Sequence, residues 1–327
     1  MITIANVRLA LAGALTIALA CASGVVAAQS YPSKPVRFVV SFPPGAGTDV
    51  IARLIGRDLQ DMLGQPVVVE NKPGAAGNIA ADIVAKADPD GHTLLMANST
   101  FAANVGVFTK LPFDPVKDFA PVTLVGSAPL LIAASQTSGI ESLQTLVQRA
   151  KAQPGRLSYA SCGNGGPPHI IGEQFMKLQG IEVTHVPYKG CGPATTDVLS
   201  GHVPLLFTNF SSAVRHLPSG KLKALAVTLK QRSPLAPDVP TVAELGLGDL
   251  DADLWFGVVV TAGTPKEIVG RLNTDIRKIL AQPEVTQKLR ALTIEPRTTS
   301  EEEFATYLKA EIARYTSLAR QFGIKVD

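Results

Sequence analysis

Short apolar runs alternate with stretches of helical spacing along most of this chain, starting near residue 36. In the first part, three apolar runs predict strands and two stretches between them predict helices: VRFVVSF (36–42), IARLIGRDLQDML (51–63), VVVEN (67–71), NIAADIVAKA (78–87) and HTLLMAN (92–98). Strands that alternate with helices at this spacing indicate a parallel sheet with helices packed on its faces. The strands are apolar throughout, which is expected where both faces are covered.

The segment FAPVTLVGSAPLLIAA (119–134) is longer than an ordinary strand and is interrupted by Pro129. It suits a strand that leaves one domain and enters another. A second series of predicted strands and helices follows: helices at 142–152, 169–179, 194–201 and 212–220, and strands at 157–161, 183–188, 203–210 and 221–228.

The C-terminal part begins with LWFGVVVT (254–261), which we predict to be a second crossing strand. Three predicted helices come after it. The last one, residues 301–323, is amphipathic, because apolar residues recur at helical spacing. Those residues are Phe304, Leu308, Ile312 and Tyr315.

Together these elements predict an α/β protein of two lobes, each a mainly parallel sheet flanked by helices, joined by two crossing strands. We expect one lobe to comprise residues 29–127 together with 256–327, and the other to comprise residues 128–255. Two lobes joined in this way leave a cleft between them, which is a common place for a small-ligand site.

The first 28 residues have the pattern of a secretory signal peptide. Arg8 precedes a short apolar run at residues 9–20, and the Val-Ala-Ala sequence at 26–28 offers small residues for cleavage. We therefore expect cleavage near Ala28 and a periplasmic location. The alternative is lipidation at Cys21, although a lipobox favours leucine three positions earlier and this chain has alanine there.

Composition and motifs argue against several classes of function. The formal net charge is only +3 and no basic run occurs, which argues against nucleic acid as a partner. The histidines show neither HExxH nor another metal-ligand spacing, and no GxSxG sequence is present. We therefore expect binding rather than catalysis, with no metal and no cofactor.

The segment FPPGAGTD (42–49) joins a predicted strand to a predicted helix. Backbone N–H groups at a helix N-terminus and the helix dipole both favour an anion. Prolines fix such a turn and glycines allow close approach, although an ordinary tight turn is the alternative. We expect Thr48 or Asp49 to cap the helix. The candidate ligand residues here are Phe42, Gly45, Ala46, Gly47 and Thr48.

The segment SCGNGG (161–166) repeats this arrangement after a later strand. Two such turns, one in each lobe, would hold the two ends of a diacid. Polar residues also end two other predicted strands, at the edge where open α/β sheets bind ligands, or else they cap the next helix. A lone histidine such as His169 is more often structural than a ligand contact. The remaining candidates are Ser99, Thr100, Ser161, Asn164, Gly165, His169 and Asn209.

Two cysteines, Cys162 and Cys191, lie beyond the predicted signal peptide. An even number of cysteines in an oxidising compartment permits a disulfide. The alternative is a pair of free thiols in adjacent glycine-rich loops.

Several segments of the chain together resemble the periplasmic solute receptors of tripartite tricarboxylate transporters, the Bug-type or TctC-like family. They are YPSKPVRFVVSFPPGAGTDVIAR, VVVENKPGAAGNIAA, DPDGHTLL, PYKG, GKLKALAVT, RSPLAPDVPTVAE and WFGVVVTAGTP, with the terminal amphipathic helix. The resemblance covers essentially the whole mature chain. It implies a type II periplasmic-binding-protein fold that closes on its ligand, and a membrane partner with a large and a small subunit.

The resemblance also implies that backbone amides and small polar side chains hold the ligand carboxylates, often through ordered water. On this chain, residues 42–48 and 99–100 would form the first-lobe site, and residues 161–166 the second. One departure concerns residues 208–210, where many members have an aspartate and this chain has Thr-Asn-Phe. This loop suits an amino-bearing ligand less and predicts an apolar wall at Phe210.

We therefore expect a monomeric, non-enzymatic receptor that captures a di-, tri- or aromatic carboxylate outside the cytoplasm and delivers it to a tripartite transporter. One alternative is a carboxylate-sensing receptor for a membrane signalling kinase. Another is an enzyme on the same scaffold, since a fold alone does not determine function.

Overall fold

The computed structural model describes residues 31–326 of the 327-residue chain. The chain divides into two compact units, residues 1–33 and residues 34–327. The predicted signal peptide, its cleavage site near Ala28 and the alternative lipidation site at Cys21 lie outside the described residues. The sheets and helices described here all belong to the second unit.

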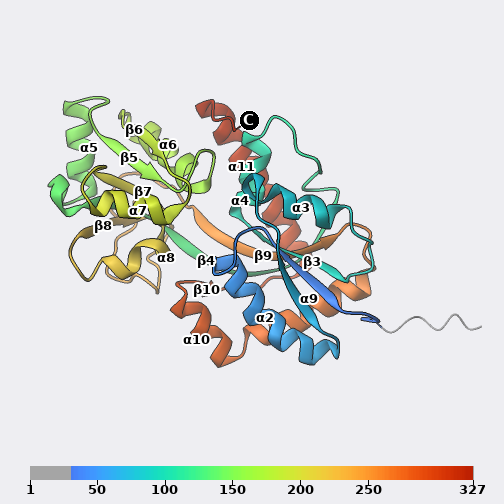
Figure 1. Cartoon of the computed structure of the whole chain (residues 1–327). Coiled ribbons are helices and arrows are strands. Elements are labelled where there is room, and N and C mark those ends of the chain that lie inside the picture. Colours follow the sequence, from blue (N-terminus) through green and yellow to red (C-terminus); the bar gives the residue numbers. More distant parts are fainter. Residues whose placement is uncertain (1–30, 327) are drawn as a thin grey trace, which may run out of the picture. The chain divides into compact units, whose positions relative to one another are not determined.

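A first sheet combines the N-terminal strands with two longer strands (Figure 1). Strands β1 (Val36–Val40), β2 (Val67–Asn71) and β3 (Thr93–Asn98) are parallel, with β1 in the middle. β3 pairs antiparallel with β9 (Asp253–Thr261), and β9 pairs antiparallel with the first part of β4 (Phe119–Ser135). The predicted parallel core is confirmed, and the crossing strands add antiparallel pairs to it.

A second sheet contains the later strands. β5 (Ser158–Ser161) is parallel to both β6 (Thr184–Pro187) and β7 (Leu205–Asn209). β7 and β8 (Leu222–Val227) each pair antiparallel with the last part of β4. This sheet therefore also has a parallel core with antiparallel strands at one side.

Strand β4 belongs to both sheets and changes its partner at Pro129. Pro129 lies opposite Asp253 of β9, whereas the next residue, Leu130, lies opposite Asn209 of β7. Proline has no N–H for a ladder hydrogen bond, so the change of partner falls where the ladder is already interrupted. The short strand β10 (Glu295–Pro296) pairs with β4 just before this point.

Helices flank both sheets (Figure 1). Those near the first sheet are α2 (Gly47–Leu63), α3 (Asn78–Ala85), α4 (Ser99–Val107), α9 (Lys266–Leu280), α10 (Pro283–Ala291) and α11 (Glu301–Phe322). Those near the second sheet are α5 (Leu143–Ala152), α6 (Pro167–Gln179), α7 (Cys191–Leu199) and α8 (Phe210–Ala213). Single 3-10 turns occupy Ala75–Gly77, Gln136–Ser138 and Val214–His216.

The C-terminal helix α11 has the amphipathic pattern predicted for it. It begins with a capping box, in which Ser300 and Glu303 each accept a hydrogen bond from the other's backbone N–H. The four predicted apolar positions are all buried. The Phe304 ring lies on Gly257 of β9, where a Cβ atom would be only 2.4 Å from the ring. Glycine at this position therefore lets α11 pack directly on the crossing strand.

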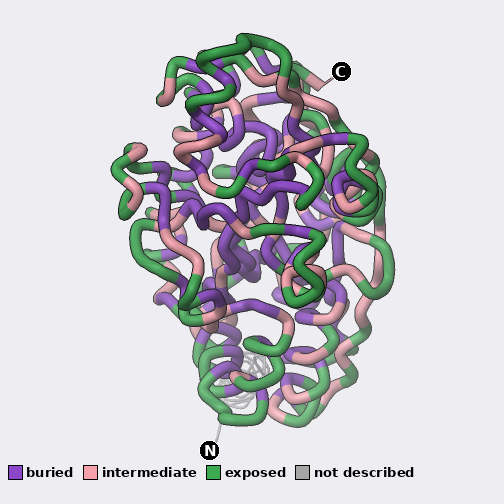
Figure 2. Tube along the Cα trace, turned by 90° about the vertical axis from the view of Figure 1, so that its left-hand side faces the viewer, coloured by how far each residue is buried: buried purple, intermediate pink, exposed green. Residues whose placement is uncertain are grey.

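Buried residues run through the interior of the trace, and exposed residues lie on the outer loops (Figure 2). Among the largest fully buried side chains are Phe38 and Trp255 on the first sheet and Tyr159 and Phe207 on the second. Fully burying a large apolar side chain contributes about 1.5–3 kcal/mol. Among residues 31–326, no helix is both long and apolar enough to cross a membrane.

Candidate functional site

The first candidate segment, residues 42–49, runs from the end of β1 into the start of α2. α2 begins at Gly47 with Ala46 as its N-cap residue, and no side chain of the described residues caps its first turn. The first N–H groups of a helix have no partner inside the helix, so this end keeps backbone donors for a ligand. The prediction that Thr48 or Asp49 caps the helix is wrong, because both lie within its first turn.

The Asp49 carboxylate fixes the shape of this segment. Its Oδ2 accepts a hydrogen bond from Gly45 N–H (2.9 Å), and its Oδ1 accepts from Arg53 Nε (3.0 Å) and Asn71 Nδ2 (2.9 Å). The same Asn71 nitrogen donates to the Phe42 carbonyl (2.9 Å). Burial raises the pKa of Asp49, but the hydrogen bonds from Arg53, Gly45 and Asn71 outweigh it and lower the pKa below its usual value. Asp49 therefore stays ionised and organises the loop.

The predicted ligand residues of this segment fall into two groups. The N–H of Gly45 bonds to Asp49, and the N–H of Ala46 donates within the turn. Gly47 and Thr48 instead occupy the first positions of the uncapped helix. Thr48 is 3% exposed, and its Oγ1 has no hydrogen-bond partner among the described residues. An unpaired buried hydroxyl costs about 1–3 kcal/mol, so Thr48 is the side chain of this segment best prepared to meet a ligand.

The predicted residues Ser99 and Thr100 begin α4 at the end of β3. Asn98 caps this helix by accepting a hydrogen bond from Thr100 N–H (3.1 Å). Ser99 is fully buried, and its Oγ accepts from Trp255 N–H (2.8 Å) and donates to the Asp253 carbonyl (3.4 Å). The Ser99 hydroxyl thus ties α4 to β9, which leaves the half-buried Thr100 as the available side chain.

A further segment at this edge, residues 74–78 between β2 and α3, has no sequence pattern that assigns it to a ligand. Ala75 and Ala76 have φ values of 46° and 53°, a conformation that costs a non-glycine residue about 1–3 kcal/mol. Asn104 Nδ2 holds the segment by donating to the Ala76 carbonyl (3.0 Å) and to Asn78 Oδ1 (2.7 Å). The two glycines of GAAG were the only local signal of this strained turn.

A small polar cavity of about 10 Å³ lies beside this segment. That volume is close to the minimum that holds one water molecule. Its lining combines the ends of β1 and β3 with residues from α3 and α4: Ser41, Ala76, Gly77, Asn78, Asn98, Phe101 and Asn104.

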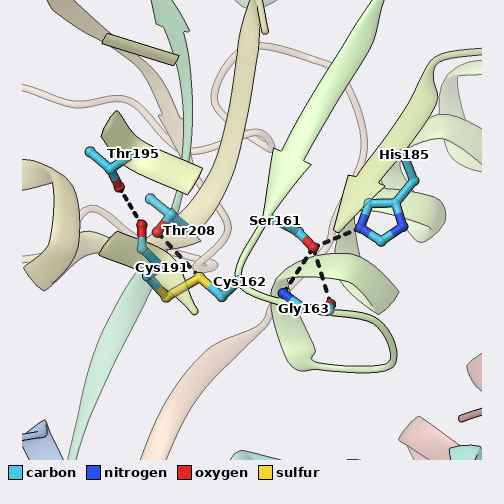
Figure 3. The surroundings of a disulfide bond; sticks show 7 residues. All are labelled: Ser161, Cys162, Gly163, His185, Cys191, Thr195 and Thr208. Carbon is cyan, nitrogen blue, oxygen red and sulfur yellow. Dashed lines mark hydrogen bonds between the residues drawn. A yellow bond between two sulfur atoms is a disulfide. The ribbon is translucent and has the colours of Figure 1, made fainter. Parts of the chain in front are cut away.

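In the second sheet, β5 ends at Ser161, the first residue of the β5–α6 loop (residues 161–166). The Ser161 hydroxyl is fully buried and hydrogen-bonds with His185 Nε2 (2.6 Å) and with the backbone of Gly163 (3.1 Å to O, 3.3 Å to N) (Figure 3). Ser161 therefore shapes the loop from within.

His169 supports the same loop from the start of α6. Its Nδ1 accepts a hydrogen bond from Gly165 N–H (3.0 Å), and its ring stacks on His185 with ring centroids 3.7 Å apart. Burial and the neighbouring His185 lower the pKa of His169 to about 3, and burial lowers the pKa of His185 to about 4. Both rings are therefore neutral at pH 7. His169 has the structural role that the sequence left open as an alternative.

A disulfide joins Cys162 and Cys191 (Figure 3). It ties the β5–α6 loop to the first residue of α7. Cys162 Sγ also lies 3.5 Å from Thr208 Oγ1, near the end of β7. The ends of β5 and β7 and the start of α7 therefore form one connected unit.

The start of α6 does not repeat the arrangement found at α2. α6 begins with Pro167 and Pro168, which have no N–H to offer, and the N–H groups of Gly163 and Gly165 are used within the loop. α7 instead begins at Cys191, and no side chain of the described residues caps its first turn. The uncapped start of α7 is therefore the second-sheet counterpart of α2.

The two predicted asparagines differ in their surroundings. Asn164 is exposed, and its Nδ2 donates to the Lys325 carbonyl in the C-terminal tail (3.2 Å). Asn209 is half-buried at the end of β7, where no cap hydrogen bond from its side chain to α8 is present among the described residues. Of the two, Asn209 keeps its amide for a ligand.

A cavity of about 700 Å³ lies on the second sheet between β8, the end of β4 and residues 235–239. Phe210, predicted as an apolar wall, is 2% exposed and lines this cavity. The predicted ligand residues are not part of its lining as the described residues define it. Within residues 31–326, no group of three His, Cys, Asp or Glu side chains is placed to hold a metal ion.

Two α/β sheets that share one long strand, with uncapped helix ends at their strand ends, define a solute-binding protein of the periplasmic type. Residues 51–324 match the family model described as "Tripartite tricarboxylate transporter family receptor", and the chain belongs to this family. It is 36% identical over 312 residues to the protein BugT of Bordetella pertussis, covering 95% of this chain and 96% of BugT. The resemblance and the fold predicted from the sequence are confirmed.

Solved structures of similar proteins agree with this assignment. A protein of R. palustris solved with adipate has 35% identity and a TM-score of 0.81, covering 90% of this chain and 100% of that one. MatC from Rhodopseudomonas palustris, solved with bound malate, has 34% identity and a TM-score of 0.77, covering 88% of this chain and 99% of that one.

Proposed function

We propose that this protein is an extracytoplasmic receptor that captures an organic carboxylate between two lobes and delivers it to a tripartite tricarboxylate-type membrane transporter. Its family membership supports the proposal. So do the two similar structures, one of which holds adipate and the other malate. The ligand class follows as a di-, tri- or aromatic carboxylic acid.

The two lobes of the proposal are residues 29–127 with 256–327, and residues 128–255. The change of partner in β4 at Pro129 supports this boundary, because the pairing passes there from one sheet to the other. A ligand bound between the lobes would draw them together, to the extent that it binds the closed arrangement better than the open one.

The observation that carries the proposal is the start of α2. Its first turn is uncapped, and the buried Thr48 hydroxyl has no partner among the described residues. A carboxylate placed there would accept hydrogen bonds from this hydroxyl and from the N–H groups of Gly47 and Thr48. Such charge-assisted bonds are about twice as strong as neutral ones, and the helix dipole adds to them.

The far end of the ligand is assigned to the start of α7 and to Asn209. The N–H groups near Cys191 are uncapped, and the disulfide fixes them beside the β5–α6 loop. Residues 42–48 and 161–166 contain no lysine or arginine, and the two histidines behind the loop are neutral. The preference for anions would therefore come from backbone N–H groups and helix dipoles.

The proposal includes export to the periplasm, with signal-peptide cleavage near Ala28, and a monomeric, non-enzymatic receptor. Its membrane partners would be the large and small subunits of the transporter. Reconstituting these subunits in vesicles tests this part. Carboxylate uptake should require the receptor, and uptake that proceeds equally without it would contradict the delivery role.

Ligand capture is tested by thermal unfolding of protein that has been stripped of ligand by unfolding and refolding. At a ligand concentration of about 100 times Kd, binding adds about 2.7 kcal/mol to the stability, which raises Tm by about 5 °C or more. Adipate and malate should be tried first, then a wider panel of carboxylates. Adipamide is the matched control, because it keeps the chain and loses both charges. If no carboxylate raises Tm, the proposed function is wrong.

A further inference from the structure

The C-terminal tail after α11, residues 323–326, touches elements of both sheets. Val326 N–H donates to the Val107 carbonyl at the end of α4 (2.8 Å). One residue earlier, the Lys325 carbonyl accepts from Asn164 of the β5–α6 loop (3.2 Å). The tail therefore links a helix of the first sheet to the loop after β5 in the second sheet.

The β5–α6 loop is seated tightly on this tail. Gly165 has a φ of +72°, and a Cβ atom there would lie 2.6 Å from Val326 Cγ2 and 3.1 Å from Val107 Cγ2. Real Cβ atoms do not approach this closely, so only glycine fits the observed contact. On its other side, Gly165 donates its N–H to His169. The loop is thus held between the two valines and the histidine.

The tail itself has a rigid base. α4 and α11 are in close backbone contact, because a Cβ atom on Gly106 would lie 2.8 Å from Thr316 Cα. The helix end is closed by Gly323 in the left-handed conformation, and Ile324 after it is buried. The surface formed by Val107 and Val326 therefore moves together with α4, whose other end carries Thr100 of the proposed first-lobe site.

We propose that Val326, Val107 and Asn164 form a clasp that positions the β5–α6 loop against the first lobe and so strengthens ligand capture. This inference rests on the proposed function, because it assigns the three as positioning residues for that site. A contact made only when the lobes are together raises the population of the ligand-holding arrangement, and the apparent affinity rises in proportion.

The clasp can be tested without a ligand by hydrogen–deuterium exchange. A mature chain that ends at Ile324 lacks the clasp but keeps the closing turn of α11. Peptides covering residues 161–168 should exchange about tenfold faster in this variant, since the loop opens more often when its support is lost. Peptides of β1 serve as the internal reference and should not change. Equal exchange of the loop in both proteins would overturn the proposal.

Ligand affinity gives the second readout, by calorimetric titration with adipate and with malate. Asn164→Ala and Val326→Ala should each raise Kd about five- to twentyfold, in keeping with the loss of one hydrogen bond or one apolar contact. Lys325→Ala is the matched control, because Lys325 contributes its backbone carbonyl and its side chain is exposed. Unchanged or tighter binding in the Asn164 and Val326 variants would overturn the clasp. Failure of the unmodified protein to bind any carboxylate would instead overturn the proposed function.

A rescue experiment separates positioning from general stability. Gly165→Ala should weaken binding, because the new methyl group meets Val326. Adding Val326→Ala to it makes room and should restore part of the lost affinity. If the two substitutions weaken binding additively, the valine does not position the loop through Gly165, and the proposal fails.

Discussion

Replacing Thr48 with valine should strengthen the ligand-free protein and weaken ligand binding. Valine has nearly the same shape but no hydroxyl, and the Thr48 hydroxyl is buried without a partner among the described residues. An unpaired buried hydroxyl costs about 1–3 kcal/mol, so we expect the free energy of unfolding to rise by about 1 kcal/mol. In the complex, a hydrogen bond to a charged group is worth about 1.5–3 kcal/mol, so Kd should rise about tenfold to a hundredfold.

Two assays on the same samples check this pair of effects: urea denaturation without ligand, and calorimetric titration with a carboxylate that binds the unmodified protein. Thr306→Val on the exposed face of α11 is the matched control, and neither quantity should change in it. If Thr48→Val lowers the stability and leaves Kd unchanged, the hydroxyl has a structural role and the reasoning about the start of α2 is refuted.

Three further substitutions test the scaffold around the site. Cys162→Ser combined with Cys191→Ser should lower the free energy of unfolding by about 3–4 kcal/mol, as expected for a bridge across 29 residues; equal stability in denaturation without reductant would contradict this. The pKa of His169, about 3 in the folded protein, lies below the value of about 6.5 for an unfolded chain, so the unfolded state binds more protons between them and stability should fall as the pH falls. Urea denaturation at about pH 7 and pH 4.5 should show that His169→Asn is spared about 2 kcal/mol of the loss seen in the unmodified protein, and an equal loss in both would count against it. Gly257→Ala should cost about 1–3 kcal/mol through overpacking under α11, whereas Gly270→Ala in α9, where a Cβ has room, should stabilise the protein by about 0.5–1 kcal/mol; similar effects of the two would argue against the packing explanation.

The main elements of the fold were predictable because they follow from local patterns. Apolar runs separated by helical stretches indicated both parallel cores. The unusual length of the 119–134 segment and its Pro129 indicated a strand that crosses between sheets, and β4 does change its partner there. The spacing of apolar residues in the last helix indicated the face that α11 buries. Each of these signals lies within a few residues of the element that it predicts.

The roles of individual site residues were harder to predict, because their partners are distant in sequence. The Ser99 hydroxyl bonds to the backbone of Trp255, which lies 156 positions away. The Asn164 amide bonds to the tail, 161 positions away. Nothing near either residue shows that its polar group is already used, so both were natural candidates for ligand contact.

One feature of the site was visible in the sequence and was given too little weight. The second glycine-rich turn was treated as a copy of the first, although Pro167 and Pro168 follow it directly. Prolines at the first two positions remove the N–H groups that make a helix start attractive to an anion. That absence moves the expected second anion contact from α6 to the start of α7.

The central claim is that the protein holds an organic acid, and the molecule it carries from the cell tests this most directly. The protein should be exported in its natural host, purified without unfolding, denatured, and its released small molecules identified by mass spectrometry. We expect one carboxylic acid at close to one molecule per protein chain, and much less of it from Thr48→Val. A bound molecule without a carboxylate, released in the same proportion, would contradict the account.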